Sequence, residues 1–164
     1  MTSQLSTARS SKAITELWLH AVTEGEKWAN IYLGPLLEEH LAMTLRSYVR
    51  DIGLCRVVAR ELLQSEDAET LIKVAGRCLL IAGLFPAHAR RRNVRVGYFA
   101  EIGIGAYHAH ASYWGARGKR GYAECSRTAA ERFPDLVGTL RGMKNSPNIA
   151  VEMQALFVPY DKWN

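Results

Sequence analysis

The sequence predicts an all-α fold, a single-domain multi-helix bundle with two central buried helices. Three observations lead to this class. Apolar residues recur at three- and four-residue spacing along most of the chain, and glycine and proline stand at the breaks between these stretches. Hydrophobic residues make up 48% of the 164 positions and charged residues 23%, the balance of a globular protein with a packed core. We therefore assign residues 12–164 to one helical domain.

Residues 1–11 are polar, with four serines around Arg9, and we expect them to form a disordered N-terminal tail. This segment lacks the apolar stretch of a secretory signal. The longest apolar run, residues 78–85, falls far short of the roughly 20 residues that a membrane-spanning helix needs. The sequence therefore predicts a cytoplasmic protein with no membrane partner. Its three cysteines form no CxxC pair, so we expect Cys55, Cys78 and Cys125 to be reduced.

The first half of the chain carries two amphipathic helical patterns and a shorter third. The first covers residues 12–32, with Trp18 on its apolar face, and ends at Gly34-Pro35. The second begins at Pro35, and its apolar stripe runs along Leu37, Leu41, Leu45, Tyr48 and Ile52. A shorter amphipathic piece follows over residues 55–64.

Two longer patterns, residues 66–84 and 96–114, predict the central helices. The first starts in the acidic stretch after Ser65, which is typical of a helix N-terminus. Its last turns are apolar nearly all round, as in an enclosed helix, and Pro86 marks its end. The second has aromatic and small residues at helical spacing. Because Val94, Val96 and Tyr98 alternate, an extended start to this segment remains an alternative.

The last part of the chain predicts shorter elements. Three glycines punctuate a basic loop over residues 115–121, and two short helices, residues 122–133 and 135–143, are separated at Pro134. After Ser146-Pro147 comes a short apolar stretch, and we expect Tyr160 and Trp163 to dock on the body of the protein.

The net charge of +5 comes from one region of the chain. Residues 88–132 hold nine basic and three acidic side chains. Arginine binds phosphate and carboxylate through its planar fork, so Arg90, Arg91, Arg92 and Arg95 are a candidate anion site. Nucleic acid is one such partner, but no nucleic-acid-binding motif accompanies the charge, so solvent-facing arginines are the favoured interpretation.

A second candidate site is a small-ligand pocket between the two central helices. Its candidate residues are Tyr98, Glu101, Tyr107, His108 and His110. Residues two apart on a helix point about 200° from one another, so His108 and His110 cannot readily share a metal ion. We predict no metal and no cofactor, and we expect His110 to be a hydrogen-bonded core histidine.

Further features of the sequence predict packing more readily than chemistry. Glycine inside a helix costs about 1 kcal/mol relative to alanine, so Gly103 and Gly105 indicate close approach of another element. The motifs of nucleotide loops, zinc proteases and serine nucleophiles are absent. Charged neighbours of Cys125 leave a lowered thiol pKa as a hypothesis.

One block of about 30 residues resembles small uncharacterised helical proteins of bacteria. It consists of Leu80-Ile81-Ala82-Gly83-Leu84-Phe85-Pro86, then Arg91-Arg92, Tyr98, Gly103 and Ala106-Tyr107. The resemblance implies a bacterial cytoplasmic helical fold and transfers no activity.

The helical pattern without a catalytic signature leads us to expect a non-enzymatic binding or regulatory module, whose partner is another protein or a second copy in a homodimer. Two alternatives stay open. One is a protein or enzyme that binds a small anionic ligand between the central helices. The other is nucleic-acid binding through the arginine-rich segments.

Overall fold

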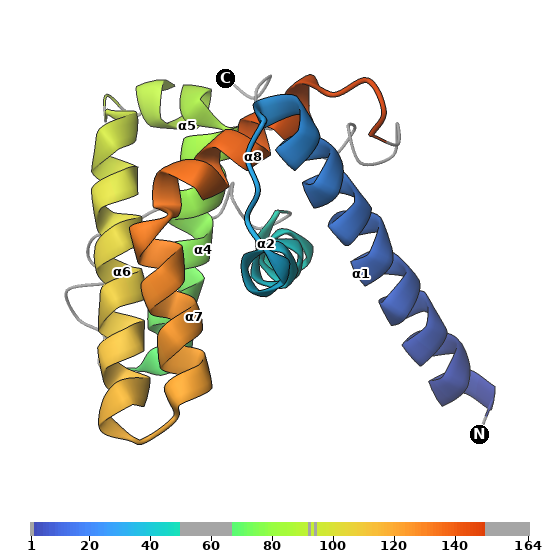
Figure 1. Ribbon diagram of the computed structural model, residues 1–164, viewed down its shortest axis with the longest axis horizontal. Coiled ribbons are helices and arrows are strands. Elements are labelled where there is room, and N and C mark those ends of the chain that lie inside the picture. The colour runs from blue at the N-terminus through green and yellow to red at the C-terminus, as the bar shows by residue number, and fades with distance from the viewer. Residues whose placement is uncertain (1, 50–66, 92, 94, 150–164) are drawn as a thin grey trace.

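Helices form every regular element in the part of the chain that the computed structural model describes, residues 2–49, 67–91, 93 and 95–149 (Figure 1). The predicted all-α multi-helix bundle is therefore confirmed. The helices are α1 (Thr2–Ala29), α2 (Pro35–Tyr48), α4 (Ala68–Leu84), α5 (Pro86–Arg91), α6 (Val96–Ala116), α7 (Arg120–Glu131) and α8 (Phe133–Asn145). None of them is both long and apolar enough to span a membrane.

Helix α4 lies at the centre of the bundle, where it packs against α6, α8 and α2. Its last turns are apolar all round, and the side chains of Leu79, Leu80 and Ile81 are fully buried. The Asp67 carboxylate accepts hydrogen bonds from the amides of Glu69 and Thr70, so the helix starts two residues later than predicted. Burial on every side confirms that the first of the two predicted central helices is enclosed.

Helix α6 runs beside α4 and carries α7 on another side (Figure 1). It is helical from Val96 onward, so an extended start is wrong for Val96 and Tyr98, whereas Val94 lies outside the described residues. A Cβ on Gly103 would lie 2.8 Å from the Phe133 ring and 3.0 Å from Cβ of Cys78, whereas a Cβ on Gly105 would meet nothing within 4 Å. Close packing is thus confirmed at Gly103 and is wrong for Gly105.

Helix α1 begins at Thr2, so residues 2–11, which we expected to form a disordered tail, are helical in the structure. No glycine or proline interrupts the chain before Gly25, which lets the helix extend beyond its apolar stretch. The N-terminal end of α1 projects away from the other helices in Figure 1. Its later turns pack against α2 and α8, where a Cβ on Gly142 would come within 2.2 Å of the Gly25 carbonyl oxygen.

The junction between α7 and α8 falls at Arg132 rather than at Pro134, where we predicted it. Pro134 lies in the first turn of α8 instead. Proline is tolerated there because an amide in the first turn has no partner within the helix. The two short helices are present, but the proline marks the start of the second and not the gap between them.

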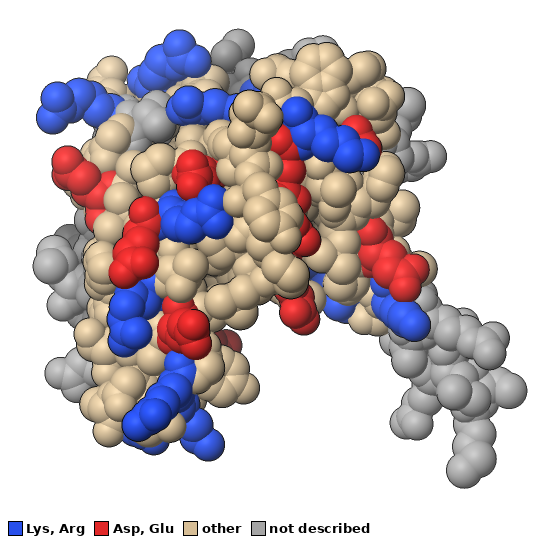
Figure 2. Space-filling view, in the orientation of Figure 1, with Lys and Arg blue, Asp and Glu red and all other residues tan. Residues whose placement is uncertain are grey.

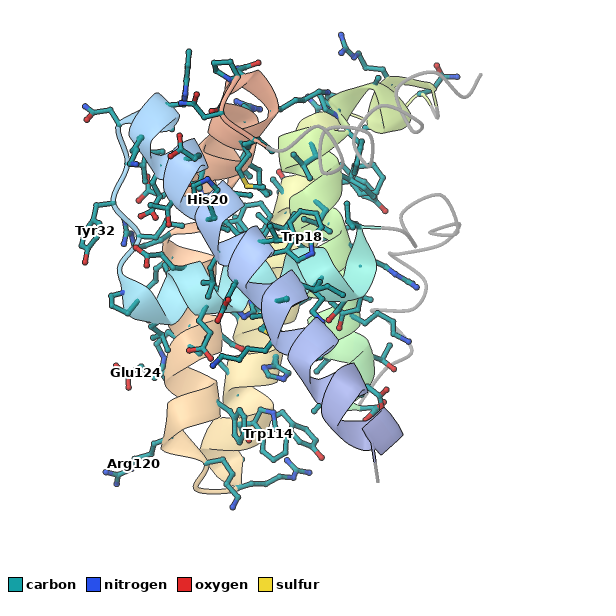
Figure 3. The ribbon with its side chains drawn as sticks, turned by 90° about the vertical axis from the view of Figure 1, so that its right-hand side faces the viewer. Trp18, His20, Tyr32, Trp114, Arg120 and Glu124 are labelled. Carbon is teal, nitrogen blue, oxygen red and sulfur yellow. The ribbon has the colours of Figure 1, made fainter. Side chains whose placement is uncertain are left out.

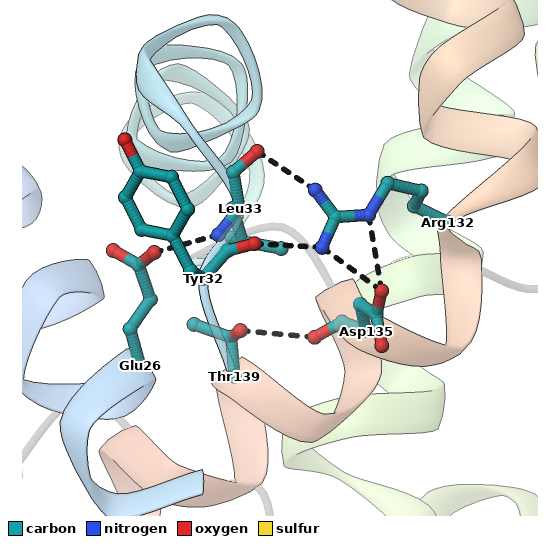
Figure 4. Close-up of polar contacts among 6 residues, drawn as sticks. All are labelled: Glu26, Tyr32, Leu33, Arg132, Asp135 and Thr139. Carbon is teal, nitrogen blue, oxygen red and sulfur yellow. Dashed lines mark hydrogen bonds and ion pairs between the residues drawn. The ribbon is translucent and has the colours of Figure 1, made fainter. Parts of the chain in front are cut away.

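Arg132 fastens this junction to the turn between α1 and α2 (Figure 4). Its guanidinium donates to the carbonyl oxygens of Leu33 at 2.9 Å and Tyr32 at 2.7 Å, and it pairs with Asp135. From the other side, the Glu26 carboxylate accepts a hydrogen bond from the Leu33 amide at 2.8 Å. The turn that starts α2 is therefore held at both its amide and its carbonyl groups.

Several expectations fall on residues outside the described ranges. They are the amphipathic piece at residues 55–64, the contribution of Ile52 to the second helix, the state of Cys55, and the docking of Tyr160 and Trp163.

Candidate functional site

A groove of about 600 Å³ opens between α2, the α6–α7 turn and the first half of α7. Most of its lining is apolar, although charged side chains stand around it. It is lined by Leu36, Glu39, His40, Met43, Gly118, Lys119, Arg120, Gly121, Tyr122 and Cys125. Leu36, Met43 and Tyr122 are among the most exposed large hydrophobic side chains of the described residues, which makes this groove the strongest candidate for a ligand site.

The α2 wall of the groove follows from helical spacing. Leu37, Leu41 and Leu45 face the core and are fully buried. Leu36, His40 and Met43, spaced at i, i+4 and i+7, form a second stripe that faces the groove. Only the buried stripe of this helix was predicted from the sequence. The same helical periodicity would also have revealed the stripe that faces the groove.

The opposite rim of the groove is basic. Gly118 turns the chain with φ 71°, and Lys119 and Arg120 follow it directly at the start of α7. Helix α7 has no acidic residue in its first turn and no side-chain cap. Figure 3 shows Arg120 projecting from the beginning of α7, with Glu124 about one turn further along. The positive end of the helix dipole adds to these cationic side chains, so the rim favours an anionic group.

At the floor of the groove, the His40 imidazole meets the Tyr107 phenol. Nε2 of His40 lies 2.8 Å from the Tyr107 hydroxyl, and the two rings are in edge contact. Burial lowers the pKa of His40 to about 4, with a smaller contribution from His110, so the imidazole is neutral at pH 7. Burial also raises the pKa of Tyr107, so the phenol keeps its proton. The floor is therefore neutral and hydrogen-bonded.

Another histidine, His110, is buried one turn after Tyr107 on α6. Its Nδ1 lies 2.6 Å from the Ser126 hydroxyl, and its Nε2 accepts a hydrogen bond from the Trp114 indole at 3.1 Å. Because the indole can only donate, Nδ1 must carry the imidazole proton and donate it to Ser126. The prediction that His110 is a hydrogen-bonded core histidine is confirmed.

Aromatic side chains support the end of the groove. The ring of Tyr122, 62% exposed, lies against the indole of Trp114 with a centroid distance of 5.3 Å. Arg117 lies 3.6 Å above the Tyr113 ring in a cation–π contact. Trp114 appears at the lower end of the bundle in Figure 3. This packing backs the groove-facing tyrosine with a second ring.

The five residues of the predicted ligand pocket do not come together. Tyr107 and His110 are buried on the inner side of α6, whereas Tyr98, Glu101 and His108 are exposed on its outer side. Only Tyr107 reaches the groove floor, through His40. Sequence reasoning did not find His40 as a site residue because its partner lies 67 positions away in the chain.

The candidate arginine site lies at the other end of α6. Arg90 and Arg95 are exposed, whereas the side chains of Arg91 and Arg92 lie outside what the structure describes. With 21 residues in α6, its two ends are about 32 Å apart. In Figure 2, basic side chains accordingly gather at both ends of the α6–α7 column. Arg90 and Arg95 therefore form no common patch with Lys119 and Arg120.

The thiols match the expectations in part. Cys78 is fully buried and reduced, as predicted. Burial, with Glu39 and Glu124 adding to it, raises the pKa of Cys125, so the hypothesis of a lowered thiol pKa is wrong. The protonated thiol at the groove wall is a poor nucleophile.

Among the described residues, no three His, Cys, Asp or Glu side chains are grouped closely enough to hold a metal ion. No protein-family model, curated protein or solved structure matches this chain.

Proposed function

We propose that this protein is a non-enzymatic helical binding module that takes a small amphipathic anion into the groove between α2 and α7. The observation that carries the proposal is the juxtaposition of an apolar wall with a cationic rim. Leu36 and Met43 offer the wall to the apolar part of a ligand, while Lys119 and Arg120 face its anionic group. Phosphate, carboxylate and sulfonate groups share the chemistry that this rim recognises.

The balance of apolar and charged groups favours an amphipathic ligand over a purely ionic one. Exposed leucine and methionine side chains gain free energy when a ligand covers them, at about 25 cal/mol for each Å² of apolar surface. Methionine also adapts its shape to the ligand that it contacts. A bare inorganic anion would leave Leu36, Met43 and Tyr122 in water, so we expect it to bind weakly.

Binding without catalysis is favoured by the protonation states at the groove. The Cys125 thiol is protonated, and the Tyr107 phenol is buried and protonated. His40 lacks a carboxylate partner among its hydrogen bonds. The groove therefore offers recognition groups without an activated nucleophile.

Calorimetric titration with octane-1-sulfonate and with octan-1-ol tests the proposal. The two probes share their alkyl chain, and the sulfonate is anionic at every pH used. We expect the sulfonate to bind at least about tenfold more tightly, equivalent to about 1.4 kcal/mol. Replacing both rim cations, K119Q with R120Q, should remove most of this preference and leave octan-1-ol binding unchanged.

The matched control removes the same two charges from the other end of α6. The double variant R90Q with R95Q has the same net charge as the rim variant but should bind the sulfonate like the unaltered protein. Equal weakening by both double variants would show that net charge attracts the probe and would overturn the groove as the site. Absence of sulfonate binding to the unaltered protein would overturn the proposed function itself.

A further inference from the structure

His40, which is partly buried, and His110, which is buried, are both neutral at pH 7, but they differ in which ring nitrogens are hydrogen-bonded. Both nitrogens of His110 are used, since Nδ1 donates to Ser126 and Nε2 accepts from Trp114. If Nε2 also carried a proton, its N–H would face the indole N–H of Trp114, and neither group could accept a hydrogen bond from the other. His110 is therefore held in a single neutral state.

His40 has one committed nitrogen and one free one. Nε2 bonds the Tyr107 hydroxyl, and the ring makes no other hydrogen bond with the described residues. Nδ1 is also not among the fully enclosed polar atoms of this part of the chain that lack a partner. Nδ1 therefore keeps some solvent-accessible surface, and His40 itself lines the groove.

The hydrogen bond to Tyr107 suits both charge states of His40. In one arrangement the phenol donates its proton to Nε2. In the other, Nε2 carries a proton and donates it to the phenol oxygen. The phenol proton then has a second acceptor, because the Thr44 hydroxyl is close to it and already donates its own proton to the His40 carbonyl oxygen at 2.8 Å. When His40 is protonated, its Nε2–H donates to the Tyr107 oxygen and the Tyr107 hydroxyl donates to Thr44, so no two donors face each other.

We propose that anion binding in this groove is coupled to proton uptake by His40, which gives its Nδ1–H to the bound anion. The inference rests on the proposed function and adds its regulation. An anion beside the ring favours the imidazolium form, and the effect is strong in a site that is partly shielded from water. When the neutral ring accepts the phenol proton at Nε2, its one ring proton is already on Nδ1, so the proton taken up from solvent is added at Nε2, which then donates to the phenol oxygen while Nδ1–H faces the anion.

Burial disfavours the charged form of His40, and His110 on α6 adds to this effect. The titratable and charged groups near the ring are Glu39 on α2, Tyr107 and His110 on α6, Lys119 in the α6–α7 turn, and Arg120, Tyr122 and Cys125 on α7. Without ligand, burial keeps the ring neutral at pH 7. An anion in the groove raises the pKa of His40 and so favours the charged ring.

Proton uptake is measured by titrating octane-1-sulfonate at about pH 6 in two buffers of different ionisation enthalpy. We expect net proton uptake on sulfonate binding, and an affinity that falls as pH rises above about 6, by no more than about tenfold for each pH unit. In H40Q the amide can still bond Tyr107 but cannot titrate, so the variant should bind with no proton uptake and a flat pH profile. H108Q, which alters an exposed histidine on α6, should leave proton uptake unchanged.

Three results distinguish failure of the coupling, failure of the assignment to His40 and failure of the proposed function. Sulfonate binding to the unaltered protein without proton uptake overturns the coupling and leaves the proposed function standing. Proton uptake that persists in H40Q overturns the assignment to His40. No sulfonate binding between about pH 5 and pH 8 overturns the proposed function and the coupling together. Circular dichroism of each variant at each pH shows whether its helices are intact.

Discussion

Gly103 and Gly105 stand two residues apart on α6, yet they predict opposite results for the same substitution. Alanine at Gly103 would press its Cβ against Phe133 and Cys78, so G103A should lower the free energy of unfolding by about 1–3 kcal/mol. Alanine at Gly105 meets nothing within 4 Å, so G105A should raise it by up to about 1 kcal/mol through helix propensity. Urea unfolding of the two variants measures both effects, and G103A as stable as the unaltered protein would contradict the packing of Phe133 on α6.

The hydrogen bond between His110 and Ser126 makes a second prediction at the scale of single residues. In S126A the buried Nδ1–H of His110 loses its acceptor, which should cost about 1–3 kcal/mol of unfolding free energy. S112A makes the same chemical change at an exposed position of α6 and should alter stability by less than about 0.5 kcal/mol. Equal stabilities of the two variants in urea would show that the Ser126 bond contributes nothing.

Single residues also show where sequence reasoning succeeds. His110 was predictable because it shares an apolar helical face with its neighbours, and periodicity alone places it inside. The same periodicity puts Tyr98, Glu101 and His108 on other faces of α6, so grouping them with Tyr107 and His110 in one pocket neglected helix geometry. The pairing of His40 with Tyr107 joins residues 67 positions apart and leaves no local signal.

The element that positions the groove is the turn between α1 and α2, because it fixes where α2 begins. The Arg132 guanidinium holds this turn, and R132Q removes its hydrogen bonds to the carbonyl oxygens of Tyr32 and Leu33 (Figure 4). We expect a loss of about 1–3 kcal/mol in unfolding free energy, together with weaker octane-1-sulfonate binding, because Leu36 lies in the first turn of α2.

D135N is the matched control for the loss of the Arg132 hydrogen bonds to the turn. It removes the charge of the carboxylate that pairs with Arg132 while leaving the two bonds to the turn in place. Because Asp135 is partly exposed, this variant should lose no more than about 1 kcal/mol in urea unfolding. A larger loss in D135N than in R132Q would mean that the ion pair, rather than the turn, carries the effect.

Helix positions were more predictable than helix boundaries. The cores of α4 and α6 follow from apolar periodicity, which tertiary packing reinforces. Polar composition at residues 2–11 indicated a tail, but polar side chains do not break a helix, and no glycine or proline stands there. The sequence predicts a gap at Pro134 because proline ends helices, yet proline also suits the first turn of a new helix, where the structure has it.

At the scale of the whole molecule, the groove exists because two distant segments converge. The sequence shows that the α2 wall belongs to an amphipathic helix and that the α6–α7 rim is basic. Their meeting depends on how α2 crosses the bundle, which no local pattern specifies. Fold class was therefore within reach of the sequence, whereas the site required the packing of all the helices.

The buried histidines make the stability of the whole fold dependent on pH. Burial lowers the folded-state pKa of His40 from 6.5 to about 4 and also lowers that of His110. Below pH 6.5 the unfolded chain therefore binds protons that the folded protein does not, so stability falls as pH falls from about 6.5 toward 4. For His40 alone the slope approaches about 1.4 kcal/mol for each pH unit.

Glu26 acts in the opposite direction. Burial and the neighbouring Glu38 raise its folded-state pKa, so its ionised form opposes folding, and stability returns as pH falls through that raised pKa. Urea unfolding without ligand at about pH 7, 6 and 5 should show a net loss toward acid. The loss should be shallower in H40Q, which removes a titrating histidine, and steeper in E26Q, which removes the opposing carboxyl. Stability that rises from pH 7 to pH 5 in the unaltered protein would mean that the carboxyl outweighs both histidines, and that these rings are charged within the fold.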